Sequence, residues 1–253
     1  MLFRSGGVSG PLGFPTSDPL VVPGGTAQAF SGGSVYWSAT GAHPVTAAFL
    51  TPWWTSGGVT GPLGFPATDS LVVPGGTAQA FAGGSVYAKD TQPAVAVYGA
   101  SRNAWWADGG VTGVLGFPTA GTTPVGSGSA TRYEGGLLYA GPSGTFRING
   151  SLLTAVDRVG GLTTLGAPIS SELLVPGGTA QAFERGSVYW SASSGAHVVS
   201  GPVRTAWWAT GGVTGPYGFP TGDVTADATG QSVQFATGTL HWATTSGAWF
   251  DAG

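Results

Sequence analysis

A four-residue motif returns five times along this 253-residue chain at a nearly constant interval. It reads Leu-Gly-Phe-Pro at residues 12–15, 63–66 and 115–118, Leu-Gly-Ala-Pro at 165–168, and Tyr-Gly-Phe-Pro at 217–220. The successive intervals are 51, 52, 50 and 52 residues. A fixed period of this size is typical of small units that bury their apolar surface against their neighbours. The sequence therefore predicts five small cores in a row in place of one large core.

The spacing of the motif divides the chain into five predicted repeats. Their bounds are 1–45, 46–97, 98–148, 149–199 and 200–253, and they are numbered 1 to 5 below. Repeat 1 begins inside a unit, because Leu2 and Phe3 align with a tryptophan pair of the later repeats. We therefore expect five nearly whole units, the first of which lacks a few leading residues.

Repeat 2 gives the clearest prediction of local structure. Thr51 is a good N-cap, and Pro52 suits the first position of a helix. Gly57 or Gly58 can take the left-handed conformation that ends a helix. These residues predict a single helical turn. The aligned N-cap positions of the later repeats are Asn103, Thr154 and Thr205.

The rest of each repeat predicts short strands. Residues 78–81 and 85–87 flank Gly83-Gly84 and read as a hairpin, and in repeat 1 a turn at Thr40-Gly41 introduces a further strand over 42–45. The glycines and prolines of the motif predict tight turns, with its leucine and phenylalanine pointing toward a core. The predicted fold class is mainly β, with three or four strands and one helical turn in each repeat.

Composition excludes several classes of function. Only 8% of residues are charged, and the eight Lys and Arg are scattered singly, which argues against nucleic-acid binding. The chain has no cysteine, hence no disulfide, thiolate metal site or cysteine nucleophile. No apolar run is long enough for a transmembrane helix. Residues 1–20 do not read as a signal peptide, and we expect this chain to be a trimmed piece of an exported precursor.

Enzymatic activity is not expected. A catalytic group is expected at a single position in a special context, whereas the acidic residues of this chain either recur with the repeat or stand alone. Residues 126–129 read Gly-Ser-Gly-Ser in a loop, which is not a nucleophile elbow, and Glu134, Glu172 and Glu184 form no persuasive pair for glycoside hydrolysis. His43 and His197 share a turn position but have no second histidine or cysteine nearby, so neither a metal nor a cofactor is expected.

The motifs recur in a fixed order that resembles a known family. Gly-x-Leu-Gly-Phe-Pro stands at 61–66, Phe-x-x-Gly-Ser-Val-Tyr-Trp-Ser at 30–38, and Thr-Gly-Ala-His at 40–43. This pattern resembles the LGFP repeat of actinobacterial cell-wall proteins over essentially the whole chain. Repeat 4 departs from it at Ala167 and at Val156-Asp157, which replace the motif Phe and the Trp pair. Ala88 and Ala140 replace the strand Trp of repeats 2 and 3, which suggests that some units are only spacers.

The resemblance implies both a location and a fold. Such repeats are found beside mycoloyltransferase, amidase and other hydrolase domains. The implied role is that of a secreted, cell-wall-associated module that holds an attached catalytic domain or surface protein at the peptidoglycan–arabinogalactan polymer. The implied fold is one small β-unit per motif, stacked with alternating orientation into an elongated stalk. A closed ring with pseudo-five-fold symmetry is the alternative.

Tryptophans are the main candidates for binding a polysaccharide. Adjacent residues on a helix point about 100° apart, so one member of each Trp pair can be buried and the other exposed. An exposed indole can stack on the apolar face of a sugar, worth about 1 kcal/mol by analogy with aromatic pairs. The alternative is that both members pack between repeats. The candidates are Trp54, Trp106 and Trp208.

A second set of tryptophans lies on a predicted strand. One position carries Tyr36, Tyr87, Tyr139, Tyr189 and His241, and its regularity indicates packing. The next residue points to the opposite face, where it is exposed or lies at a junction. This trio is the first choice for a ligand site: Trp37, Trp190 and Trp242.

Two recurring polar positions complete the candidate ligand residues. Asp18, Asp69 and Asp223 follow the motif and can accept bonds from sugar hydroxyls, although an Asp after a proline turn often satisfies local backbone donors. A Pro-Gly-Gly-Thr-Ala-Gln-Ala-Phe segment recurs in repeats 1, 2 and 4, as a retained site or as a trace of recent duplication. Its glutamines are Gln28, Gln79 and Gln181.

Three hypotheses about function follow. The first is a non-catalytic cell-wall-binding module with weak, multivalent contacts to a largely neutral polysaccharide. The second is a structural spacer or self-assembling surface protein with its tryptophans buried between repeats. The third is a stand-alone lectin that acts without an attached enzyme.

Overall fold

A computed structural model describes residues 7–90 and 92–253 of the chain. These residues form two compact parts, residues 1–123 with 129–134 and residues 124–128 with 135–253. Leu2 and Phe3, which the sequence aligns with a tryptophan pair, lie outside the described residues.

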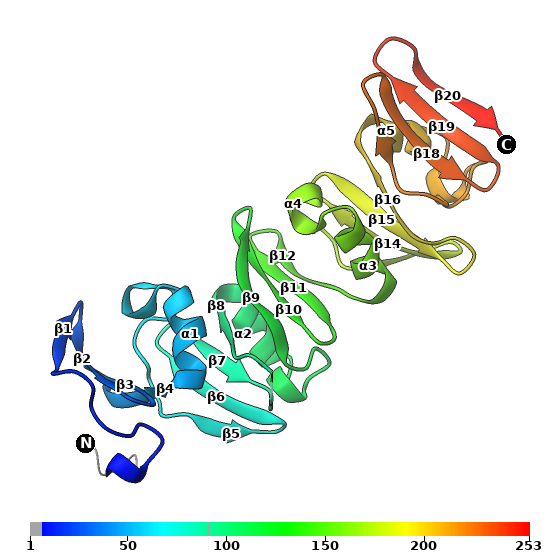
Figure 1. Cartoon of the computed structure of the whole chain (residues 1–253). Helices are drawn as coiled ribbons and strands as arrows, with labels where there is room; N and C mark the ends of the chain where they lie inside the picture. The colour runs from blue at the N-terminus through cyan, green and yellow to red at the C-terminus, as the bar shows by residue number, and fades with distance from the viewer. Residues whose placement is uncertain (1–6, 91) are drawn as a thin grey trace. The chain divides into compact units, whose positions relative to one another are not determined.

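Five four-stranded antiparallel sheets follow one another along the chain (Figure 1). In every sheet the strands pair in the order of the sequence, and no sheet of the described residues closes into a barrel. The strands are β1 (Leu20–Val22), β2 (Gly25–Phe30), β3 (Gly33–Ser38), β4 (Gly41–Thr46), β5 (Leu71–Val73), β6 (Gly76–Phe81), β7 (Gly84–Ala88), β8 (Val95–Tyr98), β9 (Pro118–Val125), β10 (Gly128–Tyr133), β11 (Gly136–Gly141), β12 (Gly144–Ile148), β13 (Leu173–Val175), β14 (Gly178–Phe183), β15 (Gly186–Ser191), β16 (Gly195–Ser200), β17 (Thr225–Ala226), β18 (Gly230–Phe235), β19 (Gly238–Ala243) and β20 (Gly247–Ala252).

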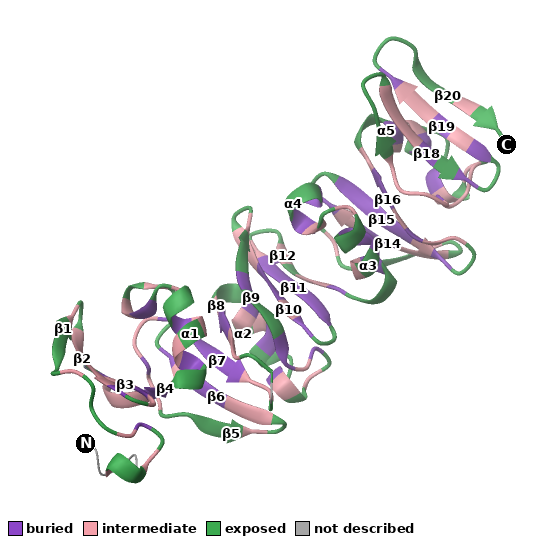
Figure 2. Ribbon diagram, viewed as in Figure 1, coloured by how far each residue is buried: buried purple, intermediate pink, exposed green. Residues whose placement is uncertain are grey.

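These sheets confirm the mainly β fold and its predicted hairpins. β6 and β7 meet with Phe81 opposite Gly84, and β3 and β4 meet with Ser38 opposite Gly41. The first strand of repeats 1, 2 and 4 is short and largely exposed, as Figure 2 shows for β1 and β5. The five predicted repeat bounds remain a proposal. Each of the four internal bounds falls near the end of a fourth strand, namely β4, β8, β12 and β16.

A helix follows the fourth strand of each of the first four sheets. The helices are α1 (Ala47–Thr55), α2 (Gly99–Ala107), α3 (Gly150–Arg158), α4 (Gly161–Leu165) and α5 (Gly201–Ala209). Single 3-10 turns stand at Gly7–Ser9, Gly58–Thr60, Gly110–Thr112 and Gly212–Thr214.

The prediction of single-turn helices beginning at Thr51 was wrong. α1 has nine residues and its N-cap is Thr46, directly at the end of β4. Thr51 and Pro52 therefore lie inside the helix, and Asn103, Thr154 and Thr205 have the same place in α2, α3 and α5. The helical ending was predicted correctly, since Gly57 has a left-handed φ of 100° and its N–H bonds to Trp54 O.

Each long helix is packed between sheets. Around α1 the core joins Tyr36 of β3 and Phe81 of β6 through Phe49 and Trp53 of the helix. Around α5, Val203 and Trp207 join β15 and β18 in the same way. The Trp53 indole N–H also donates to Gly64 O over 2.8 Å, which ties the helix to the next motif. The predicted inward Leu of the motif is confirmed by the buried Leu12, Leu63, Leu115 and Leu165.

The motif phenylalanine has a more specific role than the predicted core packing. The Phe65 ring lies against the Pro-Gly-Gly turn of repeat 1, so that a Cβ on Gly25 would meet the ring at 3.0 Å. Phe117 lies against Gly75, and Phe219 lies against Gly177 and Gly178 in the same way. Phe14, by contrast, is 64% exposed. The glycines of the turn therefore make room for a ring supplied by the following repeat.

Candidate functional site

The helical Trp pairs are divided between core and surface. The first member of each pair, Trp53, Trp105 or Trp207, is completely buried. The second members are exposed by 53%, 52% and 44%, and we call them the outer tryptophans: Trp54, Trp106 and Trp208. This division agrees with the prediction from helical geometry.

A glycine fixes the position of each outer tryptophan. Gly58 follows α1 with a φ of 58°, and a Cβ on it would lie 2.8 Å from the six-membered ring of Trp54. Gly110 and Gly212 have φ values of 55° and 57° and the same relation to Trp106 and Trp208. One part of each indole is thus held against bare backbone, while about half of the side chain is open to solvent.

Buried aromatic rings support the outer tryptophans from the inner side. Trp54 lies 5.0 Å from Trp53 and 6.4 Å from Tyr36 between ring centroids. In α5 the Trp208 indole N–H donates to the Tyr189 hydroxyl over 2.7 Å. Since these rings belong to the packed core, the exposed indole surface is preorganised before any ligand arrives.

The outer tryptophans of α1 and α2 differ in their charged neighbours. The guanidinium of Arg102, one helical turn before Trp106, lies 5.6 Å from the centre of the Trp106 ring. Its Nη2 also donates to Ser85 Oγ over 3.0 Å. At the corresponding place in α1 stands Leu50, so Trp54 has an uncharged surrounding on this side.

The strand tryptophans lie on the face opposite the buried tyrosines, as predicted. Tyr36, Tyr87, Tyr139 and Tyr189 are buried. Trp37 is 49% exposed, whereas Trp190 and Trp242 are half-buried. The difference arises because α3 packs on β15 and α5 packs on β19, while among the described residues no α-helix precedes β1.

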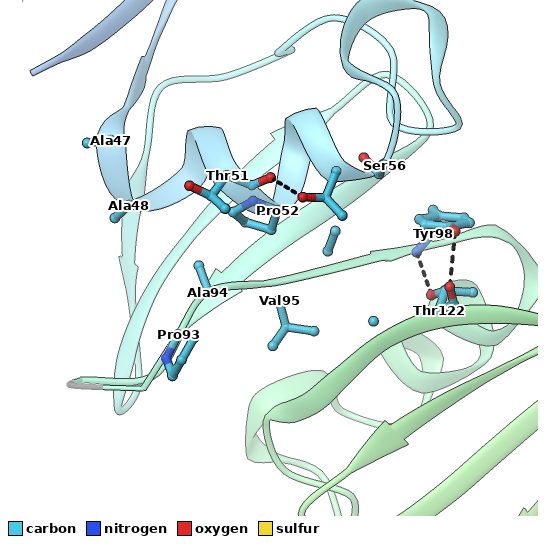
Figure 3. A pocket seen from close by; sticks show the side chains of 13 residues that line it. Ala47, Ala48, Thr51, Pro52, Ser56, Pro93, Ala94, Val95, Tyr98 and Thr122 are labelled. Atoms are coloured by element: carbon cyan, nitrogen blue, oxygen red, sulfur yellow. Dashed lines mark hydrogen bonds between the residues drawn. The ribbon is translucent and has the colours of Figure 1, made fainter.

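A groove runs along the outer side of two helices. Beside α5 it has a volume of about 460 Å³ and is lined by Pro202, Thr205, Ala206, Ala209, Trp242 and Ala248. Beside α1 the corresponding groove has about 580 Å³ and is lined by small apolar and hydroxyl side chains of α1, by residues 93–96 and by Tyr98 (Figure 3). Two of its hydroxyls are engaged within the protein, since Thr55 donates to Thr51 O and Tyr98 donates to Thr122 O. The α5 groove differs from the α1 groove in having an indole, that of Trp242, in its lining.

The glutamine candidates have a structural role. Gln79 and Gln181 are buried, and each side-chain amide donates to two backbone carbonyls. Gln79 Nε2 bonds to Thr68 O and to Pro44 O of the preceding repeat, at 2.9 and 2.8 Å. Gln181 Nε2 bonds in the same way to Ser170 O and to Arg147 O. Burial leaves these two amides no access to a polysaccharide, and they join neighbouring repeats.

Two of the aspartate candidates also reach the preceding repeat. Asp69 Oδ1 lies 2.8 Å from His43 Nδ1 on β4. Asp223 accepts from the Val198 N–H and from Arg158, and lies 3.5 Å from His197. Burial raises the pKa of Asp223, but the bonds from Arg158 and Val198 outweigh this effect and hold its pKa below the ordinary value. Asp18 is exposed.

Sequence reasoning missed the histidines as partners of these aspartates. His43 and His197 were considered only as metal ligands, although each precedes a repeat with an aspartate after its motif. Repeats 2 and 3 have Val95 and Phe146 at the histidine position, and the repeats that follow them have Gly121 and Ser171 in place of the aspartate. This covariation between neighbouring repeats is a signal that the sequence alone contained.

Two further observations bear on the classes of function. The described residues include no cluster of three or more His, Cys, Asp or Glu side chains placed to hold a metal ion. Across residues 7–90 and 92–253, every helix is too short or too polar to cross a bilayer.

Comparison with known families identifies the repeat. The profile of the LGFP repeat matches residues 12–61, 63–113 and 165–215, which together make up more than half of the chain. The chain belongs to the LGFP repeat family. The LGFP repeat is not a catalytic domain, and no enzyme domain is detected in the chain. As a repeat family, it is consistent with a surface or binding module.

Other comparisons add little to this assignment. No curated protein matches the chain. Among solved structures, the extracellular domain of a protein described as the one component system BT4673 from B. thetaiotaomicron matches at 11% identity and a TM-score of 0.18. The match covers 90% of this chain but only 28% of the other, and so slight a likeness carries no argument about fold or function.

Proposed function

We propose that this LGFP-repeat chain is a non-catalytic module that binds a cell-wall polysaccharide through its outer tryptophans. The observation that carries the proposal is the recurrence of one arrangement, an exposed indole held against a left-handed glycine, at the ends of α1, α2 and α5. A rigid indole with an open face matches the apolar face of a sugar ring. The low charge of the chain suits a largely neutral polymer such as the peptidoglycan–arabinogalactan wall.

Several weak contacts would act together in this proposal. Each stacked ring contributes about 1 kcal/mol, which alone gives no useful affinity. When one polymer spans several sites, avidity can exceed the single-site affinity by about 10²–10⁴-fold. The module would serve to hold an attached catalytic domain or surface protein at the wall, in a secreted, cell-wall-associated location.

A sedimentation assay with isolated, mycolate-free actinobacterial wall tests the proposal. The variant Trp54→Ala/Trp106→Ala/Trp208→Ala should lose retention on the wall, while Trp37→Ala/Trp190→Ala/Trp242→Ala serves as a matched control for the number of indoles removed. Phe in place of each outer Trp keeps a ring and should restore part of the binding. The proposal fails if the outer variant is folded and sediments with the wall as well as the parent chain does.

The same assay identifies the polymer. Retention on complete wall, with loss on wall stripped of arabinogalactan, would show that the chain reads arabinogalactan. Equal retention on both would indicate peptidoglycan.

The second candidate function is a structural spacer. It is favoured by the side chains that the structure commits to joining repeats, namely Gln79, Gln181, Asp69 and Asp223. A chain that binds neither wall preparation, with or without its outer tryptophans, would support this candidate.

A further inference from the structure

Three kinds of contact join a repeat to the one before it. The motif Phe covers the preceding Pro-Gly-Gly turn, as Phe65 covers Gly24 and Gly25. The aspartate after the motif pairs with the preceding histidine, as Asp69 pairs with His43. The glutamine of the second strand donates to a carbonyl of the preceding fourth strand, as Gln79 donates to Pro44 O. Each contact therefore has one half in each of two neighbouring repeats.

The two halves vary together along the chain. Repeats 1, 2 and 4 have the Pro-Gly-Gly turn, and the repeats that follow them have Phe65, Phe117 and Phe219. Repeat 3 has Gly126-Ser127-Gly128 instead, and repeat 4 has Ala167 in place of the motif Phe. The His–Asp pair obeys the same rule at all four junctions. These residues thus specify which repeat surfaces fit together.

Repeat 1 carries the receiving half of every contact, and the described residues place no partner of these three kinds against it. Phe14 is 64% exposed and Asp18 is exposed. Gln28 donates to Ser17 O, and among the described residues it has no second carbonyl of the kind that Gln79 and Gln181 reach. Trp37 is exposed where Trp190 and Trp242 are half-covered by a helix. We call the surface formed by Phe14, Asp18, Gln28 and Trp37 the incoming face.

We propose that the incoming face binds one further LGFP repeat, which supplies a Pro-Gly-Gly turn, a histidine on its fourth strand and the helix that follows that strand. The carboxylate of Asp18 complements the histidine, and the turn accommodates the Phe14 ring. The same three contacts are already formed within this chain at the junction between repeats 1 and 2. The inference does not depend on polysaccharide binding.

A second copy of this chain does not provide the required surface. The Pro-Gly-Gly turns of repeats 1, 2 and 4 are already covered by Phe65, Phe117 and Phe219. Repeat 5 has Ala228, Thr229 and Gly230 in place of the turn and Trp249 at the histidine position. The partner is therefore a repeat of different sequence.

The experiment attaches a matching repeat and measures the accessibility of the incoming face. A second copy of residues 161–211, which contains the turn and histidine of repeat 4, is placed directly before Gly7 of the chain. Because the chain has no cysteine, Trp37→Cys provides a single thiol whose alkylation rate reports exposure. The mismatched extension, which serves as the control, replaces the added Pro-Gly-Gly by Gly-Ser-Gly and the added histidine by Phe, as in repeat 3.

We expect the matching extension to slow alkylation of Trp37→Cys at least tenfold and the mismatched extension to leave it unchanged. Adding Phe14→Ala and Asp18→Ser to the matched chain should restore fast alkylation. A Val72→Cys reporter on the exposed β5 should react equally in all forms, which controls for misfolding. Equal slowing by both extensions, or slowing by neither, would overturn the proposal. The proposal would also be overturned if alkylation of Trp37→Cys in the unextended chain became slower at high protein concentration, because a second copy of the chain would then be the partner.

Discussion

At the scale of single residues, glycines determine where aromatic side chains can lie. Gly58 and its counterparts allow an indole to lie on the backbone, and Gly25 and Gly178 allow a phenylalanine to do so. A Cβ at these positions would meet an aromatic ring at about 3 Å, and at Gly25 and Gly178 it would also meet a backbone carbonyl oxygen at 2.0 Å or less. The glycine content of the chain is therefore partly a requirement of its aromatic contacts.

Gly58→Ala/Gly110→Ala/Gly212→Ala should displace the outer tryptophans. The left-handed backbone costs about 1–2 kcal/mol with a Cβ present, and the new methyl group pushes the indole outward. We expect a lower affinity for wall polysaccharide, measured by sedimentation. A shift of the tryptophan emission to the red would show that the indoles have moved outward into solvent. Unchanged affinity despite this shift would contradict the proposal.

Asp223 should make the second compact part sensitive to acid. Its pKa is held below the ordinary value, so its contribution to stability is present above about pH 4 and is lost as the pH falls through the lowered pKa. We expect Asp223→Asn to be less stable than the parent at pH 7 and to lose less stability below about pH 4. Urea unfolding at several pH values gives the free energy of unfolding of both proteins as a function of pH. Parallel curves for the parent and for Asp223→Asn would contradict the expectation.

At the scale of elements, the long helices fill the space between sheets. Trp53, Trp105 and Trp207 are the largest buried side chains, and each touches rings from the sheets on both of its sides. The helix therefore contributes as much to joining neighbouring sheets as to its own repeat.

Trp207→Ala should destabilise its part of the chain far more than Trp208→Ala. Truncation of a buried Trp costs about 3–5 kcal/mol, whereas an exposed site usually changes stability by less than about 1 kcal/mol. Thermal unfolding of both variants measures the difference. Similar losses from the two variants would show that the outer tryptophan is part of the core.

The sequence predicted the sheets better than it predicted the junctions. Alternating strands and glycine turns are local signals, so β6, β7, β3 and β4 could be placed from residues alone. The start of α1 could not, because Thr51 and Pro52 offered a plausible cap while the true cap at Thr46 depends on where β4 ends. Gln79 and Asp69 were read as ligand contacts because their partners belong to another repeat, 25 or more residues away. Whether the outer tryptophans bind sugar stays a prediction.

At the scale of the whole molecule, the repeat order has physical meaning. The junction between repeats 3 and 4 lacks both the Phe–turn contact and the His–Asp pair, whereas the one between repeats 4 and 5 has both. The repeats are thus similar in fold but not equivalent in what they can be joined to.

The elongated stalk remains our prediction for the shape, with the closed ring as the alternative. Small-angle X-ray scattering distinguishes an extended chain from a compact one, because a compact chain of this length has a radius of gyration of about 18 Å. We expect a clearly larger value. A radius near that of a compact globule would exclude the stalk.

The division of each contact between two repeats restricts how the gene can be rearranged. Recombination that removes repeat 3 would bring the Pro-Gly-Gly turn of repeat 2 against Ala167, leaving a gap where a ring should be. Removal of repeats 2, 3 and 4 together would instead join the turn and His43 of repeat 1 to Phe219 and Asp223, a complete match. Lineages of this array should therefore gain and lose repeats in particular blocks, and the breakpoints that survive should be those that keep both halves of a junction compatible.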